Sequence, residues 1–374
     1  MKIPLSNPDI TEKEIQAVVS VLRTPNLSLG PKLPEFEEAF AKYIGVKHAV
    51  ALNSGTSGLH LCIRALDIKD GDEVITTPFS FIASSNCILF ERAKPVFVDI
   101  RQDTLNIDED RIEEKITSKT KAILAVDVFG YPCDMQRIRK IAQKHGLKVI
   151  EDACEAIGAE VKGKKSGSFG DCGVFAFYPN KQMTTGEGGM LVTNDDKIAG
   201  LARSMRNQGR DEGMKWLAHD RLGYNYRLSD INCALGIVQL QRIDEILAKR
   251  EKAAERYFSK LASIEEIILP PRGKGSIKRS WFVYVVRLKD RFSGEQRDQI
   301  IKKLKEKGIG CNSYFPPIHL QPFYQKQFGF NRGDFPLTEK VADRSLALPF
   351  YNNLTAAQID QVAENLAAII REVK

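Results

Sequence analysis

The sequence lacks three features that would place it in familiar classes. No apolar run reaches the roughly 18 residues that a membrane helix needs, and the start, MKIPLSNPDITEKEIQ, has no apolar core of a signal peptide. The seven cysteines form no C-x-x-C pair, so neither a zinc ribbon nor a disulfide framework is indicated. The fingerprint G-x-G-x-x-G does not follow the first predicted strand, which argues against a nicotinamide enzyme. We therefore expect a cytoplasmic protein without a membrane segment or a metal site.

The charge balance is basic but gives little support to nucleic-acid binding. The formal net charge is +7 at pH 7, with 43% hydrophobic and 28% charged residues, which fits a folded chain. The basic clusters KGKK (162–165) and PRGKGSIKR (271–279) are short and have no interleaved aromatics for base stacking. An anionic small-molecule substrate explains the surplus at least as well.

Strand-like and helix-like runs alternate from residue 48 to residue 193, which predicts a mostly parallel sheet covered by helices. The predicted strands are HAVALN (48–53), DEVITT (72–77), KPVFVDI (94–100), KAILAVDVF (121–129), LKVIED (147–152), CGVFAFY (172–178) and GMLVTN (189–194). The length of 374 residues favours a large α/β domain with a smaller partner. We place the large domain at 1–245 and a small α+β domain at 246–374.

Helix signals flank this region. TEKE (11–14) has capping-box spacing and opens a helix with Ile15, Val18, Val19 and Leu22 on one stripe. Residues 229–261 predict one long helical segment that connects the two domains. After it, the strand-like run WFVYVVRL (281–288) and two helical runs at 296–308 and 355–373 describe the small domain.

Three strand ends carry unusual chemistry, and ligands of open α/β sheets bind at the carboxyl ends of the strands. NSGTSG (53–58) joins a strand to a helix, so its amides form a phosphate site unless the glycine only makes a tight turn. The next is Asp152, which either faces a cation or caps a helix. Lys181 is an ordinary solvated lysine unless an enclosed site beside another cation lowers the pKa of its amine.

Together these groups are the parts that a pyridoxal 5′-phosphate (PLP) site requires. Lys181 would bind the cofactor aldehyde covalently, Asp152 would keep the pyridine nitrogen protonated, and the amides after residue 54 would hold the phosphate. At about 4 Å and an effective dielectric of 20, the carboxylate and the pyridinium attract by roughly 4 kcal/mol.

A family resemblance rests on a set of motifs in a fixed order. These are NSGTSGLHL, GDEVITTPFSFIASSNCI, PVFVDI, VDVFGYPCDM, VIEDACEAIGA, SGSFGDCGVFAFYPNKQMTTGEGGM and GYNYRLSDINCALGIVQL. The chain resembles the DegT/DnrJ/EryC1/StrS sugar aminotransferases over nearly its whole length. The resemblance implies the fold-type I, aspartate aminotransferase-like fold of PLP-dependent transferases.

The resemblance also implies roles for particular residues. Lys181 matches the cofactor-binding lysine, which also moves a proton. Asp152 matches the partner of the pyridine nitrogen, and Glu155 matches a position near the ring hydroxyl. Phe81 matches the aromatic that stacks on the cofactor ring, although its motif is otherwise typical of a core. The family's sugar dehydratases have a histidine in place of the lysine, so Lys181 argues against that reaction.

The phosphate site implied by the family involves two chains. Gly55, Thr56 and Ser57 match its phosphate loop, and Asn225 matches a residue that reaches the phosphate of the neighbouring subunit, which implies a homodimer with shared active sites. Many relatives have a serine where this chain has Ala176. One phosphate hydrogen bond is therefore missing or supplied by another group, at a loss of about 1 to 3 kcal/mol if it is not replaced.

Substrate contacts are less well defined. Glu187 follows the lysine in a glycine-rich stretch and either fixes a turn or approaches a sugar. The segment SYFPPIHLQPFY (313–324) resembles the family's segment near the nucleotide sugar, which makes Tyr314 and His319 candidates. A buried structural histidine explains His319 equally well.

The expected activity is a ping-pong transamination from glutamate, which leaves as 2-oxoglutarate, to a nucleotide-linked keto-sugar. Resemblance to perosamine-type 4-aminotransferases favours a 4-keto-6-deoxyhexose and a place in surface-polysaccharide synthesis. Two alternatives stay open: another PLP reaction on the same fold, such as desulfuration, and a non-catalytic regulator that binds PLP or a sugar. A regulator should carry a DNA-binding module, and the chain begins almost at the family's N-terminal helix, which leaves no room for one.

Overall fold

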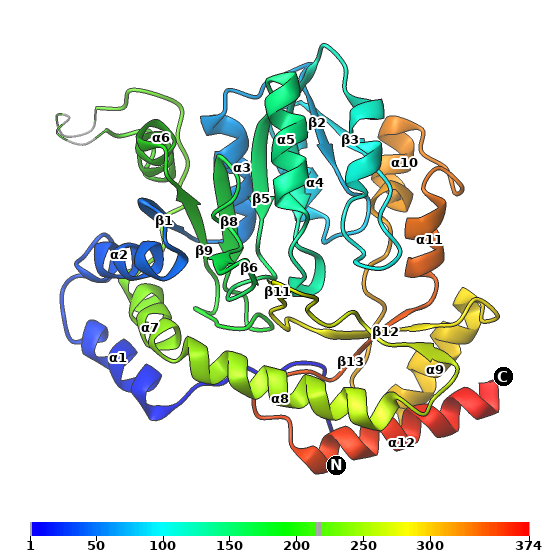
Figure 1. The fold of residues 1–374 in the computed structure, drawn as a ribbon. Helices are drawn as coiled ribbons and strands as arrows, with labels where there is room; N and C mark the ends of the chain where they lie inside the picture. The colour runs from blue at the N-terminus through cyan, green and yellow to red at the C-terminus, as the bar shows by residue number, and fades with distance from the viewer. Residues whose placement is uncertain (1, 212, 214, 216–217, 374) are drawn as a thin grey trace.

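The computed structural model describes residues 2–373 except 212, 214 and 216–217, and its largest element is a seven-stranded sheet (Figure 1). The strand order is β1-β9-β8-β5-β4-β2-β3; β9 is antiparallel to both of its neighbours and the other pairs are parallel. The strands are β1 (His48–Leu52), β2 (Glu73–Thr76), β3 (Lys94–Phe97), β4 (Thr120–Val126), β5 (Lys148–Asp152), β8 (Cys172–Ala176) and β9 (Gly189–Thr193).

Helices cover both faces of this sheet because its strands are apolar on both sides. Successive residues of β1 show this: Val50 and Leu52 pack into one core, whereas Ala49 and Ala51 pack into another. The helices around the sheet are α2 (Lys32–Ile44), α3 (Gly55–Ala65), α4 (Ala83–Leu89), α5 (Met135–His145), α6 (Asp196–Arg206) and α7 (Asp230–Gln241). Short 3-10 turns lie at Glu109–Arg111, Glu113–Lys115, Val128–Gly130 and Ile318–Leu320.

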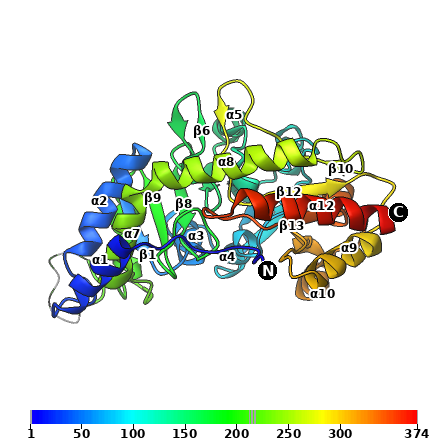
Figure 2. The same cartoon turned by 90° about the horizontal axis from the view of Figure 1, so that it is seen from below.

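A second sheet has the order β10-β12-β13 and a core of its own. Its strands are β10 (Ile267–Ile268), β12 (Tyr284–Leu288) and β13 (Ser345–Leu348). Two long helices, α8 (Ile243–Leu261) and α12 (Ala356–Val373), lie beside each other in this part, and both chain ends lie near them (Figure 2). The remaining helices are α9 (Gly294–Glu306), α10 (Pro322–Phe328) and α11 (Pro336–Ala342). Within the described residues, no helix is both long enough and apolar enough to cross a membrane.

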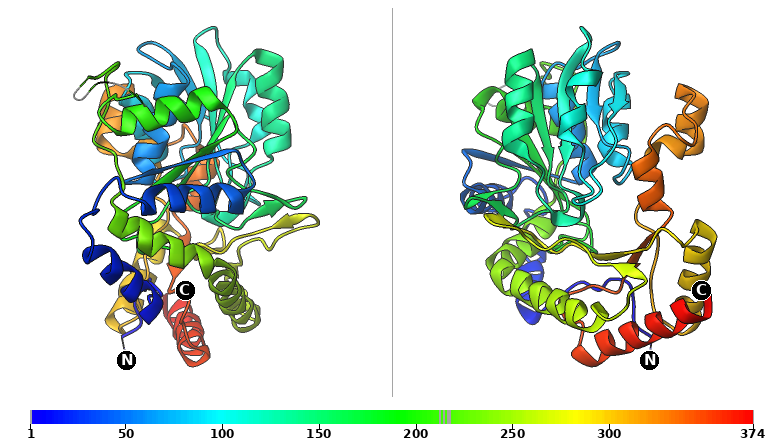
Figure 3. Two further views of the ribbon diagram at one scale, coloured as in Figure 1. Left: turned by 90° about the vertical axis from the view of Figure 1, so that its left-hand side faces the viewer. Right: turned by 45° about the vertical axis from the view of Figure 1, so that its right-hand side comes forward.

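A small third sheet projects from the body of the molecule (Figure 3). It is made of β6 (Glu160–Val161), β7 (Lys164–Lys165) and β11 (Ile277–Lys278). The two basic clusters of the sequence therefore lie in one small sheet, in β7 and β11 on either side of β6. Lys165 and Lys278 both approach the carboxylate of Glu160, at 3.2 and 3.6 Å.

The predicted α/β class and all seven strands of the large sheet are confirmed, with ends that differ by up to three residues. The predicted helical segment over 229–261 is helical except for one break, which divides it into α7 and α8. The break is at Arg242, which leaves helical geometry (φ −95°, ψ 5°) and whose buried guanidinium binds Glu14 at 2.7 Å. The domain boundary at 245 and 246, which falls inside α8, stays a prediction.

The first helix, α1 (Glu12–Leu22), begins with the predicted capping box. Its apolar stripe, however, is not buried within the chain: Ile15, Val19 and Leu22 are exposed, and the buried residues are Glu14 and Val21.

Candidate active site

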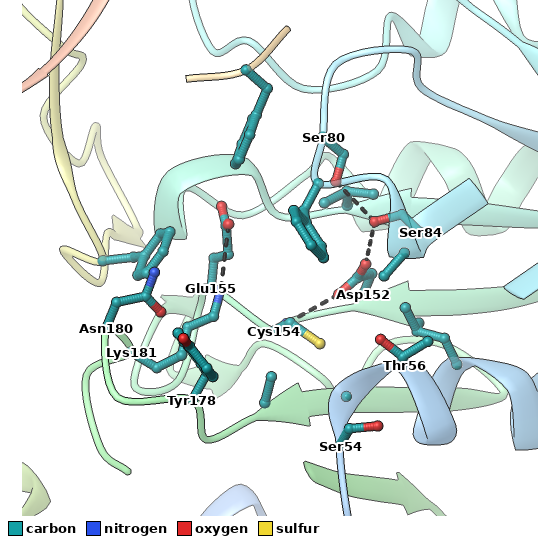
Figure 4. Close-up of a pocket in the computed structure, with 18 of the residues that line it drawn as sticks. Ser54, Thr56, Ser80, Ser84, Asp152, Cys154, Glu155, Tyr178, Asn180 and Lys181 are labelled. Atoms are coloured by element: carbon teal, nitrogen blue, oxygen red, sulfur yellow. Dashed lines mark hydrogen bonds and ion pairs between the residues drawn. The ribbon is translucent and has the colours of Figure 1, made fainter. Parts of the chain in front are cut away.

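One cavity of about 570 Å³ lies at the carboxyl ends of β4, β5 and β8, beside the start of α3 (Figure 4). This is the edge of a parallel sheet where ligands bind. The sequence-predicted residues that line the cavity are Gly55, Thr56, Phe81, Asp152, Glu155, Lys181, Glu187 and Tyr314. Ser57, Asn225 and His319 are not among its lining residues.

Asp152 ends β5 and is 4% exposed. Pairing with Val126 of β4 and Val174 of β8 fixes its backbone in the middle of the sheet. Its Oδ2 accepts a hydrogen bond from Ser84 Oγ at 2.7 Å, and its Oδ1 accepts one from Cys154 N at 3.2 Å. Among the described residues, no cationic side chain pairs with it. A buried carboxylate in this position calls for a cation from a ligand.

Lys181 lies in the turn after β8, and its side chain is 13% exposed. Its backbone N–H donates to Tyr178 O at 2.9 Å, which turns the side chain back over the sheet edge. Its Nζ lies 3.5 Å from Glu155 Oε1 and 3.9 Å from the centre of the Phe282 ring. The charged group beside this amine in the described structure is a carboxylate, whereas the sequence argument invoked a second cation.

Glu155 bridges the lysine and the backbone. Its Oε1 faces Lys181 Nζ, and its Oε2 accepts the N–H of Phe129 at 2.8 Å (Figure 4). Burial raises the pKa of the Glu155 carboxyl, and attraction to Lys181 opposes that rise. The pair therefore holds the lysine amine in a defined direction, toward Glu155 inside the same cavity that Asp152 lines.

The start of α3 forms a concave wall. Ser54 caps the helix by accepting from Ser57 N at 3.0 Å, and the first amides of a helix have no partner inside it. A Cβ on Gly55 would lie 2.8 Å from Ala176 Cβ and 3.0 Å from Cys154 Sγ, so only glycine leaves this wall open. Ala176 therefore faces the predicted phosphate loop at Gly55, and Ser54 and Thr56, the neighbours of Gly55, bring hydroxyls to the same lining.

The opposite wall is aromatic and more open. Phe81 is 61% exposed, and Tyr178 is also exposed. Tyr314 is half-buried, and burial raises the pKa of its phenol. Glu187, although exposed, lines the cavity beside these rings, so its side chain is free to approach a ligand.

The three residues outside the cavity have other surroundings. Ser57 is buried, and its Oγ donates to Asn53 Oδ1 at 2.6 Å. His319 is fully buried, with Nε2 at 3.0 Å from Glu339 Oε1 and its ring 4.7 Å from that of Phe335. This environment matches the structural alternative for His319. Asn225 is exposed and does not line its own chain's cavity, and its predicted contact to a second chain stays a prediction.

Sequence reasoning missed four residues that shape the site: Ser84, Tyr178, Asn180 and Phe282. Ser84 and Phe282 contact the two predicted key groups, Asp152 and Lys181. Phe282 lies 101 residues from Lys181 in the chain, and no local pattern indicates this pairing. The position of Asn180 directly before the lysine could have pointed to it from the sequence. In the structure its Oδ1 is buried and has no hydrogen-bond partner among the described residues.

The residues fit a PLP molecule. The cavity offers an uncompensated buried carboxylate, a nearly buried amine and a helix start with room that only a glycine leaves. These are the groups that the ring nitrogen, the aldehyde and the phosphate of PLP require. The described residues contain no cluster of three or more side chains that could hold a metal ion.

Comparisons with known proteins agree with this geometry. The model of the DegT/DnrJ/EryC1/StrS aminotransferase family matches residues 8–367. GDP-perosamine synthase of Caulobacter vibrioides is 41% identical, over 99% of this chain and 98% of that protein. The spore coat polysaccharide biosynthesis protein SpsC of Bacillus subtilis is 38% identical, over 99% and 97%.

Among solved structures, Spr1654 of Streptococcus pneumoniae, described as a sugar aminotransferase, has a TM-score of 0.95 and 30% identity. The match covers 100% of both chains, and Spr1654 has been solved in PMP and PLP forms. The architecture of the whole chain is thus that of known sugar aminotransferases. The chain belongs to the DegT/DnrJ/EryC1/StrS aminotransferase family.

Proposed function

We propose that this protein is a PLP-dependent sugar aminotransferase that transfers the amino group of glutamate to a nucleotide-linked keto-sugar. The observation that carries the proposal is the convergence of Lys181, Asp152 and the start of α3 on one cavity. These groups come from three separate parts of the sequence. If Lys181 were only a structural lysine and Asp152 only a helix cap, we would not expect both to line one cavity.

When bound, PLP carries the amino group and accepts the electron pair released when a Cα–H bond breaks. The Asp152 carboxylate stabilises a protonated ring nitrogen, and Ser84 holds that carboxylate in place. The amides at the start of α3 bind the phosphate. Lys181 Nζ would hold the cofactor and would accept the proton released from the substrate Cα, while Glu155 orients the amine.

The active unit in this proposal is a homodimer. Asn225 is exposed, and so are several large apolar side chains: Ile15, Val19, Leu22, Phe90 and Leu222. Exposed apolar groups of this number support burial against a second chain. In the dimer, Asn225 contacts the phosphate bound by the neighbouring subunit, so each site needs both chains.

Two observations support the proposed class of substrate: the aromatic, open wall of the cavity and the activities named for the relatives. Phe81, Tyr178 and Tyr314 offer aromatic surface, and Glu187 offers a carboxylate for sugar hydroxyls. The family name and GDP-perosamine synthase support a nucleotide-linked keto-sugar, with a 4-keto-6-deoxyhexose as the first candidate. SpsC supports a place in polysaccharide synthesis.

A desulfurase is less consistent with the cavity. Such an enzyme needs a reactive thiolate at the substrate, and Cys154 is the thiol in the lining. Burial raises the pKa of the Cys154 thiol well above its ordinary value, with repulsion from Asp152 as a further cause. Its protonated form is a poor nucleophile.

The test measures both half-reactions. The purified protein should be yellow, and glutamate should bleach the visible absorbance while 2-oxoglutarate is released. Nucleotide-linked keto-sugars are then added one at a time, and the visible absorbance should return only with the sugar that accepts the amino group. A colourless protein after incubation with PLP would refute the proposed cofactor, and colour without any restoring sugar would refute the proposed acceptor class.

A further inference from the structure

The segment that contains Asn225 is fixed to the same strand end that begins the phosphate loop. Leu52, the last residue of β1, forms a bridge with Arg227, and Asn53 N donates to Tyr226 O at 2.9 Å. The helix α3, whose first amides are proposed to bind the phosphate, begins at Gly55, two residues after Asn53. The backbone from Leu52 to Gly55 therefore supports both the Asn225 segment and the start of the predicted phosphate loop.

Asn53 connects these two functions through its side chain. Its Oδ1 accepts the hydrogen bond from Ser57 Oγ at 2.6 Å, inside the chain's own phosphate loop. Its Nδ2 donates to the backbone carbonyl of Asn225 at 3.3 Å. An asparagine side chain offers one acceptor and two donors, so a single residue serves both contacts.

The far side of the Asn225 segment is held by a rigid group of side chains. The rings of Tyr224 and Tyr226 stack at 4.9 Å with an angle of 10°. Tyr226 Oη lies 3.1 Å from His60 Nδ1, and His60 Nε2 lies 2.8 Å from Glu91 Oε1. The backbone of Asn225 also pairs with Asn207, so Asn53 adds a side-chain contact to a segment that is already held in place.

We infer that Asn53 is a positioning residue that acts across the dimer: it sets Asn225 for the phosphate of the neighbouring subunit while it braces the phosphate loop of its own chain. This inference rests on the proposed function, in which Asn225 contacts the neighbour's phosphate. Ser57 lies outside the cavity lining but directly follows Thr56, which lines it. Occupation of one site would therefore order the contact between Ser57 and Asn53 through the start of α3, and through Asn53 the Asn225 that the other site needs. Binding of PLP to the two subunits is then coupled.

Mixed dimers test this inference by measuring PLP affinity. One chain is wild-type, and the other carries Lys181→Ala together with a second change; two different affinity tags isolate the mixed species. The visible absorbance of lysine-bound PLP then reports only the wild-type subunit. Asn53→Ala in the other chain should weaken PLP binding at the wild-type site about fivefold, within the usual range of coupling between sites.

Two further variants separate the causes. Asn53→Asp keeps the acceptor for Ser57 but loses the donor to Asn225, so it should weaken the wild-type site as much as Asn53→Ala does. Asn194→Ala is the matched control, because Asn194 Oδ1 binds Lys47 N beside the opposite end of β1, at 2.9 Å, and this change should have no effect. The Tm of each mixed dimer shows whether a variant has only lost stability.

The outcomes distinguish this inference from the proposed function. If Asn225→Ala in the other chain weakens the wild-type site but both Asn53 variants do not, the role of Asn53 is refuted and the shared site stands. If Asn225→Ala has no effect, the shared site itself is refuted. If Asn53→Ala acts but Asn53→Asp does not, the effect runs through Ser57 alone, which overturns the link to Asn225.

Discussion

The two walls of the cavity are built in different ways. The inner wall consists of residues at a helix start, at a strand end or in the turns that follow strands of the large sheet: Gly55, Asp152, Glu155 and Lys181. The outer wall consists of side chains from loops: Phe81, Tyr178, Glu187 and Tyr314. Each charged group of the inner wall has a defined partner, whereas Phe81, Tyr178 and Glu187 are exposed.

This difference separates a constant task from a variable one. The cofactor has fixed chemistry, so its groups need fixed positions, and strand ends supply them. The sugar is the part of the reaction that differs among aminotransferases, and loops can change without disturbing the sheet. We therefore expect changes in the inner wall to affect the chemical step and changes in the outer wall to affect substrate affinity.

The largest effect should come from Lys181→Ala. Loss of the amine removes both covalent attachment and proton transfer, so the rate of the glutamate half-reaction should fall by about 10⁴-fold. Borohydride reduction followed by mass spectrometry should find no PLP attached to the variant. The exposed Lys42→Ala is the control. An adduct that persists in Lys181→Ala would show that another lysine is the attachment site.

Asp152→Asn should slow the same half-reaction by about 10³-fold, because roughly 4 kcal/mol of attraction to the ring nitrogen is lost. The amide still accepts the hydrogen bond of Ser84, so folding should be affected little. Stopped-flow absorbance measures the rate and thermal unfolding measures the stability. An equal fall of both would assign Asp152 a structural role.

Ser84→Ala provides the graded version of this experiment. The variant keeps the charge of Asp152 but removes the hydrogen bond at 2.7 Å that orients it. The expected loss is about tenfold, the value of one hydrogen bond to a charged group. A loss as large as that of Asp152→Asn would mean that orientation, rather than charge, dominates.

In the outer wall, Tyr314→Phe should raise KM for the sugar about tenfold through one lost hydrogen bond and leave the glutamate half-reaction unchanged. His319→Ala should do the opposite: it should lower the free energy of unfolding by about 2 kcal/mol, because His319 is buried against Glu339, and leave KM unchanged. A raised KM for His319→Ala with unchanged stability would restore this residue as a substrate contact.

The smallest expected effect concerns two carboxyls behind the inner wall. Burial raises the pKa of Glu151 to about 8 and that of Asp127 to about 7. Repulsion from Asp127 adds to the rise at Glu151, and both residues are fully buried. Because the folded state holds these protons more tightly than the unfolded state, stability is greatest below the unfolded pKa values and falls as pH rises through about 7 to 8.

Urea unfolding at about pH 6 and about pH 9 should show this fall as a lower free energy of unfolding at the higher pH. In the Asp127→Asn variant the side chain at 127 has no charge at any pH and no longer repels Glu151. Glu151 keeps its hydrogen bonds from the N–H groups of Gly167 and Phe169, at 2.6 and 2.8 Å. In this variant the loss between the two pH values should shrink by at least half. An unchanged loss would place its origin elsewhere.

Particular residues show which features of the site and the fold could be predicted from the sequence and which could not. Asp152 and Lys181 were identified because Asp152 ends one predicted strand and Lys181 follows another, and the carboxyl ends of parallel strands meet at one edge. The helix break at Arg242 was missed, because its cause is the distant Glu14. The α1 stripe was read correctly as a pattern, but the pattern does not tell whether its partner is this chain or another.

The sequence by itself determined the fold class, the family and the inner wall, because strand periodicity and the motifs at strand ends are local properties of the chain. The tertiary structure decided which side chains face the cavity together. Phe282 beside Lys181, Ser84 on Asp152, His319 on Glu339 and Asn53 under Asn225 all join segments that local pattern cannot relate. Such contacts depend on how the helices and sheets pack, and packing is a property of the whole chain.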